Sequence, residues 1–474
     1  MDAILYWNDV ALEANRESHS NNQKEQTGPT LSSRALAIVH LAMHDAYAGT
    51  PGLPEPLTPY LPGQGTAAPG ASVDAAIASA AHATLSALFP SQKAYFDAKL
   101  AGDTPAGTRS ELNAGRAFGT KVAEAILQHR RNDPGAGSGG YEPPQSHGGH
   151  RVDPDDPTQG FHAPFYGAGS RCFAATERFG LKPPPELGDD LYATALREVR
   201  GKGIAPELAG TLPSGFSKRT PFETMLGIWW AYDGVNKLGT PPRLYNQIVR
   251  KLAIARGNSL SGNAHLFALV NVAMGDAGIL AWEQKYLHEV WRPVVGVREH
   301  DRSMGPEGIP RPTLVPGGDP GWLPLGAPAT NSYDIARGTA KKNSTPPFPA
   351  YPSGHATFGA AAFGITRLFY GVSAPGPDTL LDGLSFVSDE LNGVNTDNRG
   401  TVRPRCERQF PGGLWRMIME NSLSRVFLGV HWSFDGFVRR ADGDINLDEN
   451  TGGVPLGLNI ADDIFTNGLH PSTV

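Results

Sequence analysis

Apolar residues recur along most of this chain with the 3.6-residue period of an amphipathic helix. This spacing predicts helices at residues 34–47, 73–88, 109–129, 191–200 and 221–232 in the first half, and at 243–254, 264–290, 356–370, 378–392 and 414–428 in the second. No stretch alternates convincingly with the period of two that marks a half-buried strand. We therefore expect an all-α fold made of two helical bundles packed together.

Long segments rich in Gly, Pro, Asn and Asp separate the predicted helices, at residues 51–71, 132–170, 301–352 and 395–412. Structureless loops longer than about 12 to 15 residues are uncommon in compact domains unless they shape a site or are disordered. A proline run within residues 169–203 indicates a junction between two helical halves. We expect an N-terminal bundle over residues 1–200 and a C-terminal bundle over 201–474.

Composition and charge narrow the class of protein. The chain has 474 residues, of which 40% are hydrophobic, and it carries a formal net charge of -6. Because no block of Lys and Arg is present, binding to nucleic acid or to an anionic membrane is not expected. The most apolar segments, 264–282 and 356–372, include Asp276 and Arg367 and have the length of buried helices, so we expect no membrane span.

The N-terminal segment and the cysteine content narrow the class of protein further. The N-terminus has neither the basic region nor the apolar run of a conventional signal peptide, so we expect a soluble protein that is cytoplasmic or exported by another route. Only Cys172 and Cys406 are present, which argues against a disulfide framework or a thiolate metal cluster. Any metal must be held by other ligands.

The first cluster of chemically interesting residues is Lys285–Arg292, followed by Pro293. Two cations seven residues apart lie on one face of a continuous helix, and Pro293 would end that helix. On most helices such a pair is a solvated stripe. By itself this cluster therefore proves little.

The second cluster is Ser353-Gly354-His355, between a proline-rich loop and a predicted helix. Free backbone N–H groups at a helix start, beside a glycine and a hydroxyl, form a cradle for an anion. His355 would then lie at the anion rather than in the core. The alternative is an ordinary N-cap serine with an incidental histidine.

The third cluster contains Arg425, His431 and Asp435. On a continuing helix the Asp435 carboxylate could reach the His431 ring four residues earlier and fix its tautomer. One ring nitrogen would then be free to act as a ligand or a nucleophile. A surface histidine with an acidic neighbour at this spacing is also common.

The three clusters together, in this order, resemble the motif of the type 2 phosphatidic acid phosphatase superfamily, which includes bacterial acid phosphatases and vanadium haloperoxidases. A multiply charged tetrahedral oxyanion needs several cations and donors. The expected donors are Lys285, Arg292, Ser353, Gly354 and Arg425.

Similarity to the fungal-type vanadium chloroperoxidases covers most of the chain, including residues 36–47, 162–167, 230–249, 325–331, 346–359, 390–395 and 453–469. This resemblance implies that Trp282 and Phe348 wall a halide site, and a phenylalanine at position 348 favours chloride oxidation. It also implies that Asp233 pairs with the site arginine and histidine. From local sequence alone, Asp233 could equally be a turn residue before Gly234.

The resemblance further implies a vanadate cofactor bound through His431, with Asp435 behind that ring. Lys285, Arg292, Ser353, Gly354 and Arg425 would neutralise the vanadate oxygens. His355 would act as general acid and base, and Lys285 would polarise bound hydrogen peroxide. Chloride or bromide would be oxidised to hypohalous acid, which halogenates a small organic acceptor.

Two other functions remain open from sequence. An acid phosphatase would use the same cage, with His431 attacking a phosphate ester, and a non-catalytic oxyanion-binding protein would need neither His355 nor His431. His40, His44 and Asp45 could suggest a metal pair, but the resemblance makes that stretch structural. His147, His150 and His162 are expected in a solvated loop, and the sequence leaves the oligomeric state open.

Overall fold

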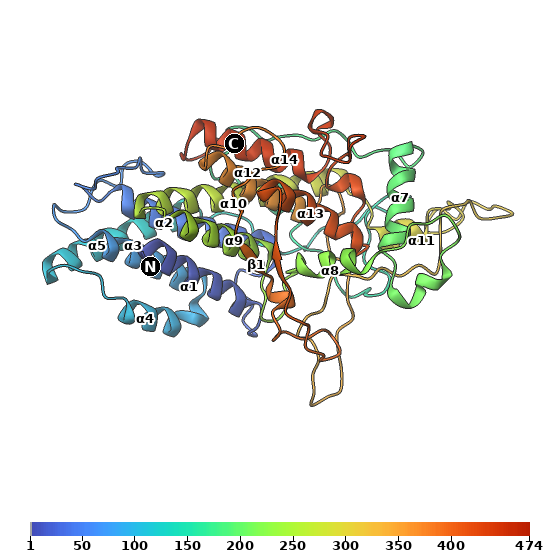
Figure 1. The fold of residues 1–474 in the computed structure, drawn as a ribbon, viewed down its shortest axis with the longest axis horizontal. Helices are drawn as coiled ribbons and strands as arrows, with labels where there is room; N and C mark the ends of the chain where they lie inside the picture. Colours follow the sequence, from blue (N-terminus) through green and yellow to red (C-terminus); the bar gives the residue numbers. More distant parts are fainter. Residues whose placement is uncertain (1) are drawn as a thin grey trace.

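The structure is a computed structural model that describes residues 2–474, and the chain folds mainly into α-helices (Figure 1). The first half contains α1 (Ala3–Ser18), α2 (Gly28–Ala48), α3 (Val73–Leu88), α4 (Lys93–Gly102), α5 (Arg109–His129), α6 (Tyr166–Gly169) and α7 (Asp190–Lys202). The second half contains α8 (Pro221–Trp229), α9 (Pro241–Arg256), α10 (Leu260–His288), α11 (Pro293–Arg298), α12 (Gly354–Phe369), α13 (Gly413–Phe427) and α14 (Gly453–Asn467). The prediction of an all-α fold is confirmed.

Short 3-10 segments lie at η1 (Pro90–Gln92), η2 (Pro206–Thr211), η3 (Asp389–Leu391), η4 (Ser433–Asp435) and η5 (Leu447–Glu449). The described residues also contain one small sheet, in which β1 (Ser385–Val387) pairs antiparallel with β2 (Glu407–Gln409). Strands of three residues are too short to give a clear alternating pattern in the sequence.

The predicted helix at residues 378–392 is wrong. This segment contains Gly383 at φ +77, a left-handed conformation that interrupts a right-handed helix, and it continues into β1. The Asp378 side chain accepts N–H groups of Leu414 and Trp415, at 3.2 and 3.1 Å, and so caps the first turn of α13. The acidic residue therefore starts a different helix from the one that the pattern predicts.

Five helices were missing from the prediction: α1, α4, α6, α11 and α14. In α14 the sequence begins with Gly453 and contains Gly457, which lowers its helical propensity. A Cβ at Gly457 would lie 2.4 Å from the Thr357 carbonyl oxygen of α12. The glycine is therefore required by the close approach of two helices, which only the packed structure shows.

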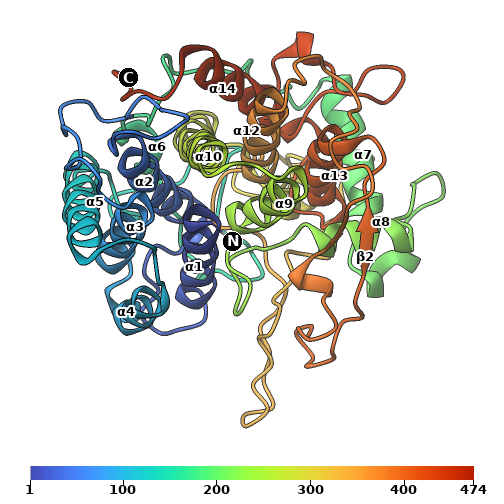
Figure 2. The same ribbon diagram turned by 60° about the vertical axis from the view of Figure 1, so that its left-hand side comes forward.

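The long helix α10 is the centre of the molecule. Figure 2 shows α1–α5 gathered on one side of it and α12–α14 on the other. By length and composition α10 could cross a membrane, but 94% of its most apolar window is buried inside the protein. It is therefore enclosed by the other helices, as in the core of a soluble protein.

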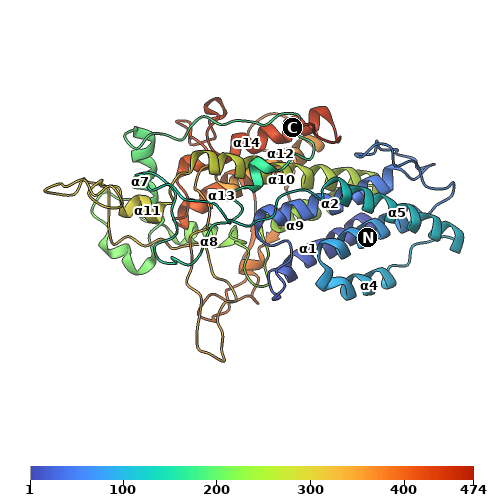
Figure 3. The same cartoon turned by 180° about the vertical axis from the view of Figure 1, so that it is seen from behind.

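A continuous cluster of buried apolar side chains joins the two halves, with Ile38 of α2, Leu280 of α10 and Phe358 of α12 among its members. The predicted boundary at residue 200 stays a prediction. Part of the predicted loop 301–352 projects from the helical body (Figure 3), while its last residues turn inward to the site described below. This loop therefore has two roles, one at the surface and one in the interior.

A buried hydrogen-bond network links four helices of this core. Asn8 of α1 lies 2.9 Å from His40 Nε2 of α2 and donates to Asn246 of α9 at 3.1 Å, and Asn246 contacts Asn271 of α10 at 2.8 Å. His40 Nδ1 donates to the Leu36 carbonyl at 2.7 Å. Both ring nitrogens of His40 are thus used within the protein, which agrees with the structural interpretation of this histidine.

Candidate active site

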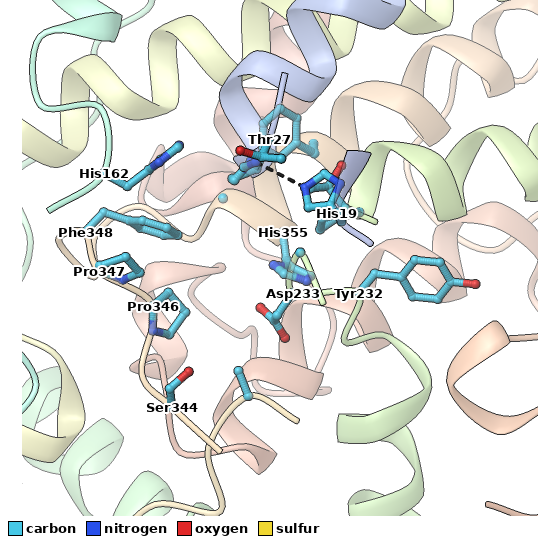
Figure 4. A pocket seen from close by; sticks show the side chains of 18 of the residues that line it. His19, Thr27, His162, Tyr232, Asp233, Ser344, Pro346, Pro347, Phe348 and His355 are labelled. Carbon is cyan, nitrogen blue, oxygen red and sulfur yellow. Dashed lines mark hydrogen bonds between the residues drawn. The ribbon is translucent and has the colours of Figure 1, made fainter. Parts of the chain in front are cut away.

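A cavity of about 290 Å³ lies between the two halves of the chain and contains most of the predicted site residues. From the second half it is lined by Asp233, Trp282, Phe348, Gly354, His355, Arg425 and His431, and from the first by His19, Lys24, Thr27, Gly28 and His162. Figure 4 shows Phe348 on one side of it, and His355 above Asp233 on the other. Lys285, Arg292, Ser353 and Asp435 do not line the cavity and lie behind it.

Lys285 lies in the last turn of α10 and is fully buried. Its ammonium group donates to the carbonyl oxygens of Pro349 at 2.8 Å, Ala350 at 3.1 Å and Pro352. Burial, and next the charge of Arg292, hold the pKa of Lys285 well below its usual value. The lysine therefore anchors the loop that leads into α12.

Arg292 reaches the same region, but not by the helical geometry that the spacing suggested. Helix α10 ends at His288, and Glu289 adopts a left-handed conformation with φ +47. Pro293 begins α11 rather than ending α10, because proline is tolerated in the first turn of a helix. The expectation of a single helical face is thus wrong, although both cations remain buried beside the cavity.

The guanidinium of Arg292 is almost completely engaged. It donates to the carbonyl oxygens of Phe348 at 2.7 Å and Val430 at 2.8 Å, and to His431 Nε2 at 2.8 Å. Its Nη2 atom is buried without a hydrogen-bond partner among residues 2–474. Burial lowers the pKa of Arg292 to about 9, against an opposing contribution from Asp435.

Ser353 is the N-cap of α12, and Gly354 is the first residue of that helix. The predicted loop-to-helix junction is confirmed. A Cβ at Gly354 would lie 3.3 Å from the Trp282 ring, so glycine keeps the helix start close to this side chain. Gly354 lines the cavity, and the first backbone N–H groups of a helix have no partner within the helix, so an anion in the cavity can accept from them.

His355 lies in the first turn of α12 and lines the cavity. Its Nε2 is 2.7 Å from the Ala231 carbonyl oxygen, and because a carbonyl only accepts, Nε2 carries the hydrogen. The Nδ1 atom has no partner among residues 2–474. Burial, followed by the charge of Arg425, lowers the pKa of His355 to about 3, while Asp233 opposes this shift.

Asp233 forms a bidentate ion pair with Arg425, with distances of 2.6 and 3.0 Å. The expected pairing of Asp233 with the site arginine is present, whereas no hydrogen bond joins Asp233 to His355. The carboxylate acts on His355 through its charge alone. Arg425 Nε is buried and has no partner within residues 2–474.

His431 and Asp435 are in contact, although no helix connects them. Helix α13 ends at Phe427, Gly429 has φ +74, and Asp435 belongs to η4. The expectation of a continuing helix is therefore wrong, but the His431 Nδ1 atom lies 2.7 Å from Asp435 Oδ2. Burial raises the pKa of Asp435 to about 7 and lowers that of His431 well below its usual value.

Trp282 and Phe348 form an aromatic wall of the cavity, with ring centroids 4.8 Å apart. The Lys285 ammonium lies 5.2 Å from the Phe348 centroid, and the Arg292 guanidinium lies 4.9 Å from it. His162 stands 6.1 Å from both aromatic rings. An apolar wall thus adjoins two buried cations.

Among the residues at or next to the site that were not identified from the sequence are His19, His162 and Glu390. The interpretation of His162 as a solvated loop residue is wrong, because it lines the cavity and its backbone N–H donates to the Pro347 carbonyl at 2.8 Å. His162 begins one of the segments that carry the family resemblance, which could have indicated a role at the site. For His19 the sequence offers no comparable signal.

The charges of the described side chains favour a multiply charged anion. Lys285, Arg292 and Arg425 are buried, and only Asp233 pairs directly with any of them. Two of their guanidinium nitrogens have no partner within the described chain. Buried cations require compensation by an anion and by hydrogen bonds, so the residues present fit a tetrahedral oxyanion such as vanadate or phosphate.

Comparison with known families agrees with this geometry. Residues 1–171 match the vanadium chloroperoxidase N-terminal domain, and residues 265–444 match the VCPO second helical-bundle domain. The chain is 36% identical to the vanadium chloroperoxidase of Curvularia inaequalis in an alignment of 575 residues, which covers 99% of this chain and 90% of that protein.

Solved structures show the same fold. A bacterial vanadium-dependent iodoperoxidase superimposes with a TM-score of 0.64 at 18% identity, over 98% of this chain and 96% of the other. The holo form of a bacterial vanadium-dependent chloroperoxidase superimposes with a TM-score of 0.58 at 17% identity, over 95% of both chains. On the strength of the sequence relationship, together with this fold, the chain belongs to the vanadium chloroperoxidase family.

Proposed function

We propose that this enzyme is a vanadate-dependent chloroperoxidase, which uses hydrogen peroxide to oxidise chloride or bromide to hypohalous acid. The acid then halogenates a small organic acceptor. One observation supports this most: three buried cations gather around His431, whose Nε2 accepts a hydrogen bond from Arg292 while Nδ1 faces Asp435. Such a ring is prepared to bind a metal through Nε2.

In this proposal His431 is the ligand of vanadium, and Asp435 holds its ring. Lys285, Arg292, Ser353, Gly354 and Arg425 hold the vanadate oxygens. When bound, vanadate supplies a Lewis acid that activates peroxide without changing its own oxidation state. The protein contributes a fixed arrangement of charges, which needs little reorganisation during the reaction.

We assign the proton transfers to His355. Its Nε2–H is fixed by the Ala231 carbonyl, so Nδ1 is the atom that can accept a proton from peroxide and return it later. The low pKa of this histidine in the anion-free protein reflects its burial and the cations around it. A bound anion offsets those cations and raises the pKa towards the range useful for catalysis. Asp233 contributes by balancing Arg425.

The aromatic wall would receive the halide. Trp282 and Phe348 exclude water from their side of the cavity, and the positive charges of Lys285 and Arg292 attract an anion to it. A halide that has lost part of its hydration shell is a better nucleophile. The absence of a titratable group at position 348 favours the oxidation of chloride.

We further infer that the enzyme works as a soluble protein, because its most apolar helix lies in the core. Its expected partners are hydrogen peroxide, chloride or bromide, and a small organic acceptor, with neither nucleic acid nor membrane. Localisation of the tagged protein distinguishes a cytoplasmic enzyme from an exported one.

A second function, acid phosphatase, is favoured by the same cage, because phosphate has the shape and charge of vanadate and His431 could attack it. The two are distinguished by assaying halogenation with peroxide, chloride or bromide and added vanadate, beside hydrolysis of a phosphate ester by the vanadate-free protein. We expect vanadate-dependent halogenation. Hydrolysis with no halogenation under any of these conditions would overturn the proposal.

A further inference from the structure

Tyr232, beside the cavity, has an unusual backbone conformation. Its φ is +46, in the left-handed region that bulky residues rarely adopt. Both neighbours contact the site: the Ala231 carbonyl accepts from His355, and the Asp233 carboxylate pairs with Arg425. A strained residue between two functional contacts persists only where the surrounding structure holds it in place.

Glu390, from η3, supplies that restraint. The side chain is fully buried, and its Oε1 atom accepts the backbone N–H of Tyr232 at 3.3 Å. Its Oε2 atom accepts from Thr330 Oγ1 at 2.5 Å and from Arg403 at 2.6 Å. The carboxylate is thus fixed on one side by two donors and presents its other oxygen to the strained peptide.

Other contacts of the same segment hold the tyrosine side chain. The Tyr232 hydroxyl donates to Gln247 of α9 at 3.1 Å and accepts the Asp389 N–H at 2.8 Å. Ser388 donates to the Trp229 carbonyl, at the end of α8, at 2.6 Å. Residues 388–390 therefore contact residues 229–232 at several points, and Glu390 is the side chain that accepts the Tyr232 N–H, on the peptide whose carbonyl contacts His355.

We propose that Glu390 is a positioning residue of the active site, which holds residues 231–233 so that the Ala231 carbonyl orients His355 and Asp233 balances Arg425. The role of Glu390 in halide oxidation rests on the proposed function. The hydrogen bonds of Glu390 and His355 do not depend on that function, so the positioning can be tested in the vanadate-free protein.

The spectroscopic test uses 15N-histidine NMR on the full-length, vanadate-free protein. We expect a protected Nε2–H signal from His355, assigned by its loss in a His355→Gln variant. Glu390→Gln keeps an oxygen that accepts the Tyr232 N–H and should keep this signal. Glu390→Ala removes the acceptor, so the signal should be lost or averaged between tautomers.

Glu390→Ala leaves Arg403 unpaired, and the variant could fail to fold for that reason alone. A double variant, Glu390→Leu with Arg403→Leu, replaces the pair by apolar side chains, a change that proteins often tolerate well. It should fold and still lose the His355 signal. A matched control is Asp133→Asn, which disrupts the buried ion pairs of Asp133 with Arg34 and Arg130 in the N-terminal half; none of these three residues lines the cavity.

Turnover of the vanadate-loaded protein gives the second measurement. A small displacement of catalytic groups can reduce rates by on the order of 100-fold. We therefore expect kcat of the double variant to fall by about 10- to 100-fold. The affinity of the vanadate-free double variant for phosphate should change by less than about threefold, because the displacement is small. Glu390→Gln and Asp133→Asn should retain most of the wild-type kcat. A folded double variant with the intact His355 signal would overturn the proposal. If wild type shows the signal but never halogenates, the proposed function fails and the positioning stands.

Discussion

The Nδ1 atom of His431 lies 2.7 Å from Oδ2 of Asp435, and both side chains are buried. The same carboxylate oxygen accepts the Trp432 N–H at 2.9 Å. A carboxylate accepting two hydrogen bonds from one short turn fixes the ring with its hydrogen on Nδ1. The lone pair of Nε2 is then directed to Arg292 and the cavity.

Asp435→Asn tests the importance of this tautomer. The amide can present its NH2 group to Nδ1, which would move the histidine hydrogen to Nε2 and remove the lone pair that the proposed function assigns to vanadium. We expect the dissociation constant for vanadate to rise roughly 10- to 100-fold, the usual effect of losing such a supporting carboxylate. The exposed Asp448→Asn is the control, and equal vanadate affinity in both variants would contradict the assignment of His431 as ligand.

Anion binding should be coupled to proton uptake at Lys285. Burial and Arg292 hold its pKa below the usual value in the anion-free protein, and a bound anion raises it. Because the bound state then carries more protons, affinity for phosphate should weaken as pH rises. Calorimetry of phosphate binding in buffers of different ionisation enthalpy measures the uptake. Lys285→Met should reduce it by up to one proton, and an unchanged uptake would exclude this lysine as its source.

Phe348→His should alter the halide preference. An imidazole between Trp282 and the two cations replaces an apolar face by a group that donates hydrogen bonds and titrates near neutral pH. We expect kcat/KM for chloride to fall relative to bromide by on the order of tenfold, with a changed pH profile. Steady-state halogenation with each halide measures this, with the exposed Phe222→His as control. The halide-wall assignment fails if both ratio and profile stay as in wild type.

His40 should make the fold sensitive to acid. Burial lowers its pKa to about 4 in the folded protein, against 6.5 for an unperturbed histidine. As pH falls below 6.5, the unfolded chain takes up a proton at His40 while the folded protein does so only near pH 4. The free energy of unfolding therefore carries the full contribution of the neutral His40 ring above pH 6.5 and loses it, roughly 3 kcal/mol, as pH falls to about 4. Urea unfolding at pH 7 and pH 4.5 measures how much free energy of unfolding is lost on acidification. This loss should be smaller in His40→Gln than in wild type, and the same as in wild type in the exposed His470→Gln. Equal acid losses in all three proteins would show that His40 does not titrate in this way.

The helical part of the fold followed from local pattern, because the burial of one helix face imposes a periodicity on the sequence itself. Val73–Leu88 and Arg109–His129 were predicted to the residue. The pattern failed at 378–392, where Gly383 and an aspartate that caps another helix override it, and at α14, whose glycines serve contact with α12.

By itself the sequence determined the fold class and predicted the oxyanion cage, because the residue types suited to holding an oxyanion stand in a fixed order along the chain. The tertiary structure decided how these residues meet. The reversal at Glu289 brings Arg292 to the His431 ring, and the turn after Phe427 brings Asp435 to the same ring. It also decided the contribution of Glu390, which contacts Tyr232 across 158 positions of sequence. Local periodicity carries no record of such contacts, since they arise only when distant segments pack around one core.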